Sequence, residues 1–142
     1  MRLQSVRRIV GALSLVVAAV AAPAAQAYTG LYVFGDSLSD SGNNASFGLY
    51  DPTQIVTGNS YIAQAAYAPA GTYSNGPVWA TSFAAMLGLT ATPSHLGGTN
   101  YAYGGARLTA DQSIGAPFNF TLKGLTSQVA QLKTDKSNVL DP

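Results

Sequence analysis

An apolar run that stops at a glycine, an acid and a serine most constrains what this sequence can fold into. Residues 31–34 are apolar and typical of a short buried β-strand, and Gly35-Asp36-Ser37 follows them directly. Open α/β sheets carry their chemistry at the carboxyl ends of their strands. The pattern therefore predicts an α/β fold in which the Ser37 hydroxyl lies at the end of a strand.

A second short strand is predicted over residues 99–103, and it ends in Gly104-Gly105. A helix is predicted between the two strands, and the order strand, helix, strand favours a parallel crossover. A glycine at a strand end lets the backbone come within about 3 Å of a substrate oxygen. The sequence therefore predicts that both strand ends contribute to one site.

Two helices are predicted from the apolar spacing. The first covers residues 77–87, with Asn75 or Gly76 as its cap, Gly88 just past its end, and a core face made by Val78, Phe83, Met86 and Leu87. The second begins at Leu122 or Thr126 and ends at Lys133, with a core face made by Leu122, Leu125, Val129 and Leu132. Residues 37–58, 61–73 and 111–120 are predicted as loops, the first with one short helical turn.

Two segments resemble conserved blocks of the SGNH/GDSL hydrolases, a family of serine esterases and lipases. Residues 34–43 (FGDSLSDSGN) resemble the first block, and residues 98–107 (GTNYAYGGAR) resemble the second. The resemblance implies an α/β fold, a three-layer α/β/α sandwich of flavodoxin-like type with a parallel sheet. It implies that Ser37 is the nucleophile, and that the N–H groups of Ser37 and Gly105, with Gly104 as the fallback, donate to the oxyanion.

The same resemblance implies hydrolysis of acyl esters, with a small-molecule or lipid substrate and no cofactor. Two further blocks of the family, Gly-x-Asn-Asp and Asp-x-x-His, do not occur in the sequence. The one histidine, His95, follows Thr92 by three positions and is interpreted as a loop residue. We therefore expect residues 28–142 to be the N-terminal portion of a hydrolase domain from an incomplete reading frame, poorly soluble and inactive alone. Losing the base of a serine triad costs about 10⁶ in rate.

The first 27 residues differ in composition from the rest. Arg2, Arg7 and Arg8 precede an apolar stretch over residues 9–22, and Ala25-Gln26-Ala27 fits a signal-peptidase site. This pattern predicts a secretory signal peptide over residues 1–27, an exported mature chain beginning at Tyr28, and no transmembrane segment after its removal. The alternative, a membrane anchor, is disfavoured because a spanning helix needs about 20 apolar residues.

Composition excludes several other classes of function. Residues 28–142 carry four basic and six acidic side chains, so no basic patch is available for nucleic acid. With no cysteine and one histidine, a metal site is not expected. The alternative to an enzyme is a secreted carbohydrate- or lipid-binding surface protein on a degenerate hydrolase scaffold, with a groove lined by Tyr50, Tyr61, Tyr67 and Tyr73.

Overall fold

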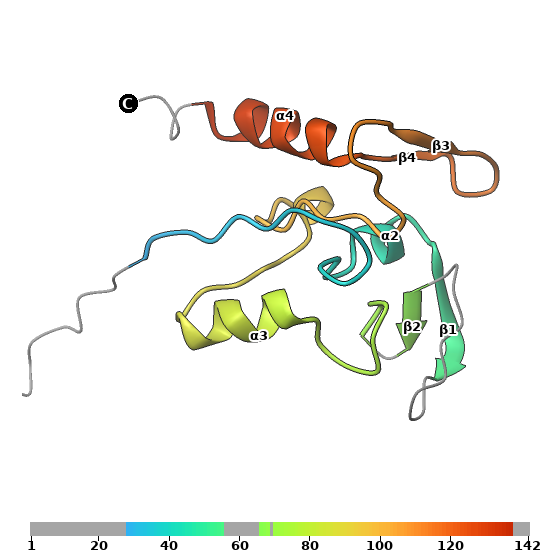
Figure 1. Ribbon diagram of the computed structural model, residues 1–142. Coiled ribbons are helices and arrows are strands. Elements are labelled where there is room, and N and C mark those ends of the chain that lie inside the picture. The colour runs from blue at the N-terminus through green and yellow to red at the C-terminus, as the bar shows by residue number, and fades with distance from the viewer. Residues whose placement is uncertain (1–27, 56–65, 69, 138–142) are drawn as a thin grey trace, which may run out of the picture.

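The computed structural model describes residues 28–55, 66–68 and 70–137 (Figure 1). The predicted signal peptide, residues 1–27, lies outside these residues. The elements in chain order are α2 (Asn43–Ser46), β1 (Tyr50–Ile55), β2 (Ala66–Ala68), α3 (Trp79–Met86), the 3₁₀ helix η1 (Ser94–Leu96), β3 (Gln112–Ile114), β4 (Phe120–Leu122) and α4 (Leu125–Asp135). The short helical turn predicted within residues 37–58 is α2.

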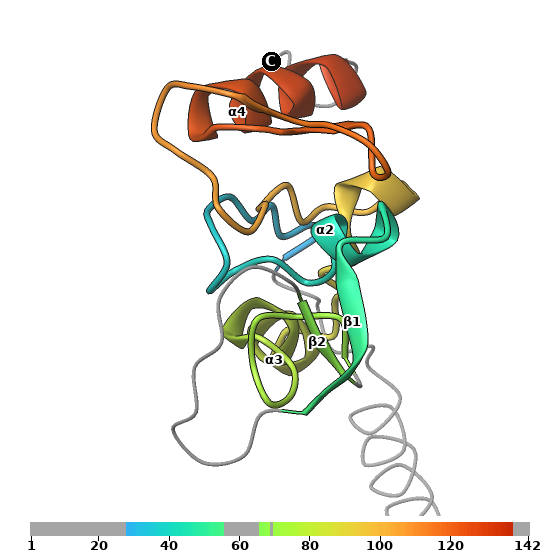
Figure 2. The ribbon, with the colours of Figure 1, turned by 90° about the vertical axis from the view of Figure 1, so that its right-hand side faces the viewer.

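Two extended segments, residues 31–35 and 98–103, run side by side through the middle of the described structure. Val33 and Asn100 form a parallel bridge. Three backbone hydrogen bonds join the segments: Val33 N–H to the Thr99 carbonyl (3.1 Å), Tyr101 N–H to the Val33 carbonyl (2.7 Å) and Tyr103 N–H to the Gly35 carbonyl (3.2 Å). Figures 1 and 2 show α4 with the β3–β4 hairpin on one side of this pair and α3 with β1 and β2 on the other. A wider parallel sheet built on the pair stays a prediction.

Three short strands, β1 to β3, lie where loops were predicted, and β4 begins at the end of the third predicted loop. β1 pairs with β2 in parallel, with Tyr50 opposite Ala66 and Asp51 opposite Tyr67, whereas β3 pairs with β4 antiparallel. Gly115 and Pro117, which suggested a loop over residues 111–120, belong to the turn between β3 and β4. The loop predictions were wrong at these strands for two reasons. β2, β3 and β4 have three residues each, too few for an alternating pattern to be recognised, and the six-residue β1 (YDPTQI) contains a proline and does not alternate.

Helix α3 begins at Trp79, after Val78 in an extended conformation, and not at Pro77. Gly88 follows the helix with a φ of +70°, as predicted. Of the predicted core face, Val78 is buried as expected, but Phe83 and Met86 were wrongly assigned to it, because they are 42% and 83% exposed. The helix instead buries its small Ala80 and Ala84 in a cluster with Val33, Val78 and Ala91. Alanines allow the helix to lie close to the central pair, so the large side chains point elsewhere.

Helix α4 begins at Leu125, so Leu122 was wrongly predicted as helical. Leu122 lies in β4 and packs with Tyr103 and Phe120 in a second apolar cluster. On α4 itself Leu132 is buried, but Val129 is 42% exposed, and the polar Gln128 is fully buried. Among the described residues, no helix has the length and apolar character needed to cross a membrane.

Candidate functional site

The loop that carries Ser37, residues 35–44, begins with a glycine that no other residue could easily replace. Gly35 has a φ of +145°, and a Cβ built on it would lie 3.0 Å from Ser39 Oγ. Asp36 then organises the turn: its carbonyl accepts from the N–H groups of Ser39 and Asp40 (both 3.0 Å), and its carboxylate accepts from Leu38 N–H (3.1 Å). The carboxylate of Asp36 therefore stabilises the turn.

Asp40 connects the Ser37 loop to the glycine pair. Its buried carboxylate accepts hydrogen bonds from four backbone N–H groups, those of Gly42 (2.8 Å), Asn43 (2.6 Å), Asn44 (3.3 Å) and Gly104 (2.9 Å). Burial raises the pKa of Asp40 above its ordinary value, and the four N–H donors oppose that rise. The Gly104 bond fixes the end of the 98–103 segment against the loop that contains Ser37.

Two buried asparagines strengthen this connection. The Asn43 side-chain amide donates to the carbonyls of Asn100 and Ala102 (both 2.8 Å). The Asn100 amide donates to the Ser39 carbonyl (2.7 Å) in return. Each asparagine is fully buried. Because buried amides are costly without partners, this reciprocal arrangement strongly favours one register between the two segments.

The two glycines at the end of the second segment differ in their surroundings. Gly104 is buried, its N–H is occupied by Asp40, and a Cβ on it would lie 2.2 Å from the Tyr73 ring. Gly105 is exposed with a φ of +84°. Within the described part of the chain, neither the Gly105 N–H nor the Ser37 N–H takes part in a hydrogen bond. The geometry therefore disfavours Gly104 as an oxyanion donor and leaves the N–H groups of Ser37 and Gly105 available.

His95 lies in η1 and not in a loop. Its ring packs against Phe47 with the ring centroids 3.8 Å apart and the planes tilted by 34°, and its backbone N–H donates to the Asn43 side chain (3.0 Å). No hydrogen bond joins His95 to Ser37 among the described residues. The described residues likewise contain no group of three or more acidic, histidine or cysteine side chains able to hold a metal ion.

Two contacts of the Ser37 loop were not predicted. The Trp79 indole N–H of α3 donates to Ser39 Oγ (3.1 Å). From α4, the Gln128 side chain hydrogen-bonds to both the N–H and the carbonyl of Gly35. A polar residue in a helix gives no sequence signal for burial, because periodicity assigns the core face to apolar positions.

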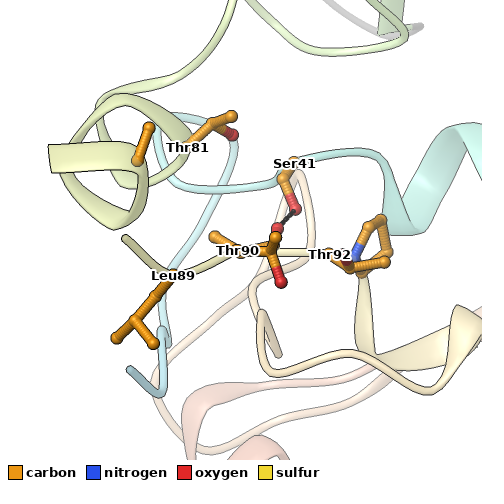
Figure 3. Close-up of a pocket in the computed structure, with 8 residues that line it drawn as sticks. Ser41, Thr81, Leu89, Thr90 and Thr92 are labelled. Atoms are coloured by element: carbon orange, nitrogen blue, oxygen red, sulfur yellow. Dashed lines mark hydrogen bonds between the residues drawn. The ribbon is translucent and has the colours of Figure 1, made fainter. Parts of the chain in front are cut away.

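A separate cavity of about 360 Å³ lies between α3 and residues 89–93 (Figure 3). Thr81 and Ala85 of α3 line one side of it, and Leu89 and Thr90 line another. Ser41, at its rim, donates to the Ala91 carbonyl (2.6 Å). Ser37 does not line this cavity.

The tyrosine groove proposed for a binding protein gains no support. The Tyr73 hydroxyl accepts a hydrogen bond from the Asn44 side chain (2.7 Å), and its ring packs against Gly104. Tyr50 is half-buried. Tyr61 and the Tyr67 side chain lie outside the described residues. Tyr73 thus supports the loop structure around Asp40.

Comparison with known proteins covers most of the chain, including both segments that meet at this site. The family model of the GDSL-like lipase/acylhydrolases matches residues 31–142. "Lipase 1" of Photorhabdus luminescens is 38% identical over 103 residues, an alignment that covers 71% of this chain and 12% of that protein. The chain thus spans about one eighth of the length of this curated relative. On the extent of the family match, the chain belongs to the GDSL-like lipase/acylhydrolase family.

Proposed function

We propose that this protein is an exported serine ester hydrolase with Ser37 as its nucleophile. Ser37 Oγ attacks the carbonyl carbon of an acyl ester, and the N–H groups of Ser37 and Gly105 donate to the resulting oxyanion. The alcohol leaves with the proton taken from Ser37, and water then releases the acyl group as an acid. The fold we propose around this site is the three-layer α/β/α sandwich of the family, with residues 31–35 and 98–103 as two parallel strands.

The observation that best supports this proposal is the availability of two N–H groups at one end of the paired segments. Tyr103 N–H bonds to Gly35, two residues before Ser37, and Gly104 N–H bonds to Asp40, three residues after it. Gly105 follows directly, so both free donors belong to the same end of the parallel pair. Donors that are fixed before the reaction stabilise an oxyanion at no cost in reorganisation.

We further propose that residues 28–142 alone hydrolyse esters very slowly. A serine hydroxyl needs a base, and the ring of the one histidine packs on Phe47. Without a base the rate falls by about 10⁶. Measurable turnover by the purified segment 28–142, abolished in Ser37→Ala, would contradict this part of the proposal.

Hydrolysis of p-nitrophenyl esters by the full-length gene product tests the activity. We expect turnover of short and long acyl esters by the wild type and by Ser41→Ala, a neighbouring serine whose hydroxyl binds the Ala91 carbonyl. We expect Ser37→Ala to lose at least about 10⁴ of the rate. Equal rates for the wild type and Ser37→Ala would exclude Ser37 as the nucleophile. The relative named a lipase makes long-chain esters a suitable first series.

Export is tested separately. We propose that residues 1–27 direct the chain out of the cytoplasm and are removed before Tyr28. N-terminal sequencing of the protein recovered from the host should begin at Tyr28. A mature N-terminus at Met1 would contradict the proposal.

A further inference from the structure

Gln128 is the most deeply buried polar residue of α4, and its amide contacts the residue where the Ser37 loop begins. Its exposed fraction is 0%. Gly35 N–H donates to Gln128 Oε1 (3.0 Å), and Gln128 Nε2 donates to the Gly35 carbonyl (2.9 Å). A further hydrogen bond from Nε2 to the Lys123 carbonyl (2.9 Å) fixes the orientation of the amide.

These contacts continue the hydrogen bonding of the parallel pair. Val33 uses its N–H and its carbonyl to bond the 98–103 segment, and Gly35, two residues later, faces the same way. The Gly35 carbonyl accepts from Tyr103 N–H, but the Gly35 N–H donates to the amide of Gln128. The side chain therefore acts as a substitute strand residue where the ladder ends and the Ser37 turn begins.

Gly35 needs such a partner because its own conformation is permissive. Its φ of +145° is accessible to glycine and strained for other residues. Because glycine has no Cβ, its backbone can also adopt many other conformations, and a hydrogen-bonding partner is needed to select this one. A primary amide supplies a donor and an acceptor together, which matches a backbone N–H and carbonyl on one residue. A carboxylate of the same size would lose the bond to the Gly35 carbonyl, and an apolar side chain would lose both bonds and leave the Gly35 N–H without a partner.

On the basis of the proposed function, we propose that Gln128 is a positioning residue for the nucleophile. By holding both backbone groups of Gly35, it sets the path of the chain into Asp36 and Ser37. The direction of Ser37 Oγ and of the Ser37 N–H depends on that path. Gln128 acts through Gly35 and does not touch the ester.

The test compares Gln128→Met, which keeps the volume and removes both hydrogen-bonding functions, with Gln128→Asn, whose shorter amide cannot span both groups of Gly35. Gln131→Met is the matched control, because Gln131 lies on the same helix and binds Lys123 (2.7 Å) and not Gly35. All are made in the full-length protein and assayed with p-nitrophenyl butyrate, below the temperature at which each unfolds.

We expect kcat to fall about 10- to 100-fold in both Gln128 variants, with KM within twofold of the wild type and Gln131→Met close to wild type. Hydrogen exchange of the Gly35 amide should accelerate in the same two variants, whether or not the protein is active. A folded Gln128→Met or Gln128→Asn with wild-type kcat would overturn the proposal, as would unchanged exchange at Gly35. If the wild type itself is inactive but Gly35 exchange accelerates in the two Gln128 variants, the proposed function is wrong, whereas the positioning of Gly35 by Gln128 is confirmed.

Discussion

The Ser37 loop and helix α3 are neighbours, joined by the bond from Trp79 to Ser39, yet they bury opposite kinds of side chain. The loop and its partner segment bury Asp40, Asn43, Asn44 and Asn100, all within hydrogen-bonding distance of backbone groups. Helix α3 buries two alanines and exposes Phe83 and Met86. Burial in the Ser37 loop therefore follows the hydrogen-bonding needs of the backbone, whereas burial on α3 favours small apolar side chains.

The difference has a physical reason. A loop that presents a serine has many backbone N–H and carbonyl groups outside regular structure, and each needs a partner when it is buried. Short amide and carboxylate side chains supply these partners at close range. A helix satisfies its own backbone, so small apolar residues on one face are sufficient for α3 to pack. The predictions below test this contrast, beginning with the largest effect.

Asp40→Ala should produce the largest loss. It removes the acceptor of four buried N–H groups, so we expect the free energy of unfolding to fall by about 3–5 kcal/mol. Urea denaturation of the full-length protein, followed by hydrogen exchange over residues 35–44 and 98–105, measures it. Asp111→Asn is the control: this exposed carboxylate accepts one hydrogen bond, from Gly124 N–H (2.8 Å), which the amide oxygen of asparagine can still accept, so the change should cost less than about 1 kcal/mol. Similar losses in both variants would show that the four buried hydrogen bonds of Asp40 stabilise the fold no more than one bond at the surface does.

Asn43→Ala should cost somewhat less, about 2–3 kcal/mol, because the carbonyls of Asn100 and Ala102 lose a donor. The same exchange experiment should show loss of protection on both segments, since Asn43 joins them. If protection were lost only near residue 43, the asparagine would not be a bridge between the two blocks.

Tyr101 gives a pH-dependent test of burial in the central pair. Burial, and after it the nearby Asp135 carboxylate, raise the pKa of Tyr101 from 10.0 to about 12. The unfolded chain therefore loses this proton at lower pH than the folded chain does, so stability is fully present below pH 10 and declines as the pH rises toward 12. Denaturation midpoints measured over this range should decline more steeply in the wild type than in Tyr101→Phe. Parallel curves would mean that Tyr101 is not buried.

Met86→Ser should produce the smallest effect, within about 0.5 kcal/mol, because this side chain is 83% exposed. A core methionine would cost about 2–5 kcal/mol when truncated. Ala84→Leu, on the buried face of the same helix, should cost about 1–3 kcal/mol by overpacking. If Met86→Ser cost more than Ala84→Leu, the two faces of α3 would be exchanged and the contrast with the Ser37 loop would disappear.

The sequence predicted the structure well where a motif is present or where apolar residues repeat regularly over a long segment. The bridge between Val33 and Asn100, the turn at Ser37 and the existence of α3 and α4 follow from motifs, glycines and apolar spacing. The strands β2, β3 and β4 have three residues each, too few for a periodic signal. The burial of Gln128 and the choice of buried face on α3 could not be predicted, because both depend on tertiary contacts. Gln128 is buried by its bonds to Gly35, and α3 is oriented by its packing against Val33 and Ala91.

Covalent labelling of the full-length protein with a fluorophosphonate tests the central claim most directly, because the reagent reacts with an activated serine and needs an oxyanion site. Peptide mass spectrometry should place the label on Ser37, and prior denaturation, Ser37→Ala or Asp40→Ala should abolish it. Labelling confined to another serine, or labelling of Ser37 that persists in the denatured protein, would contradict the account that the buried network prepares this hydroxyl for ester hydrolysis.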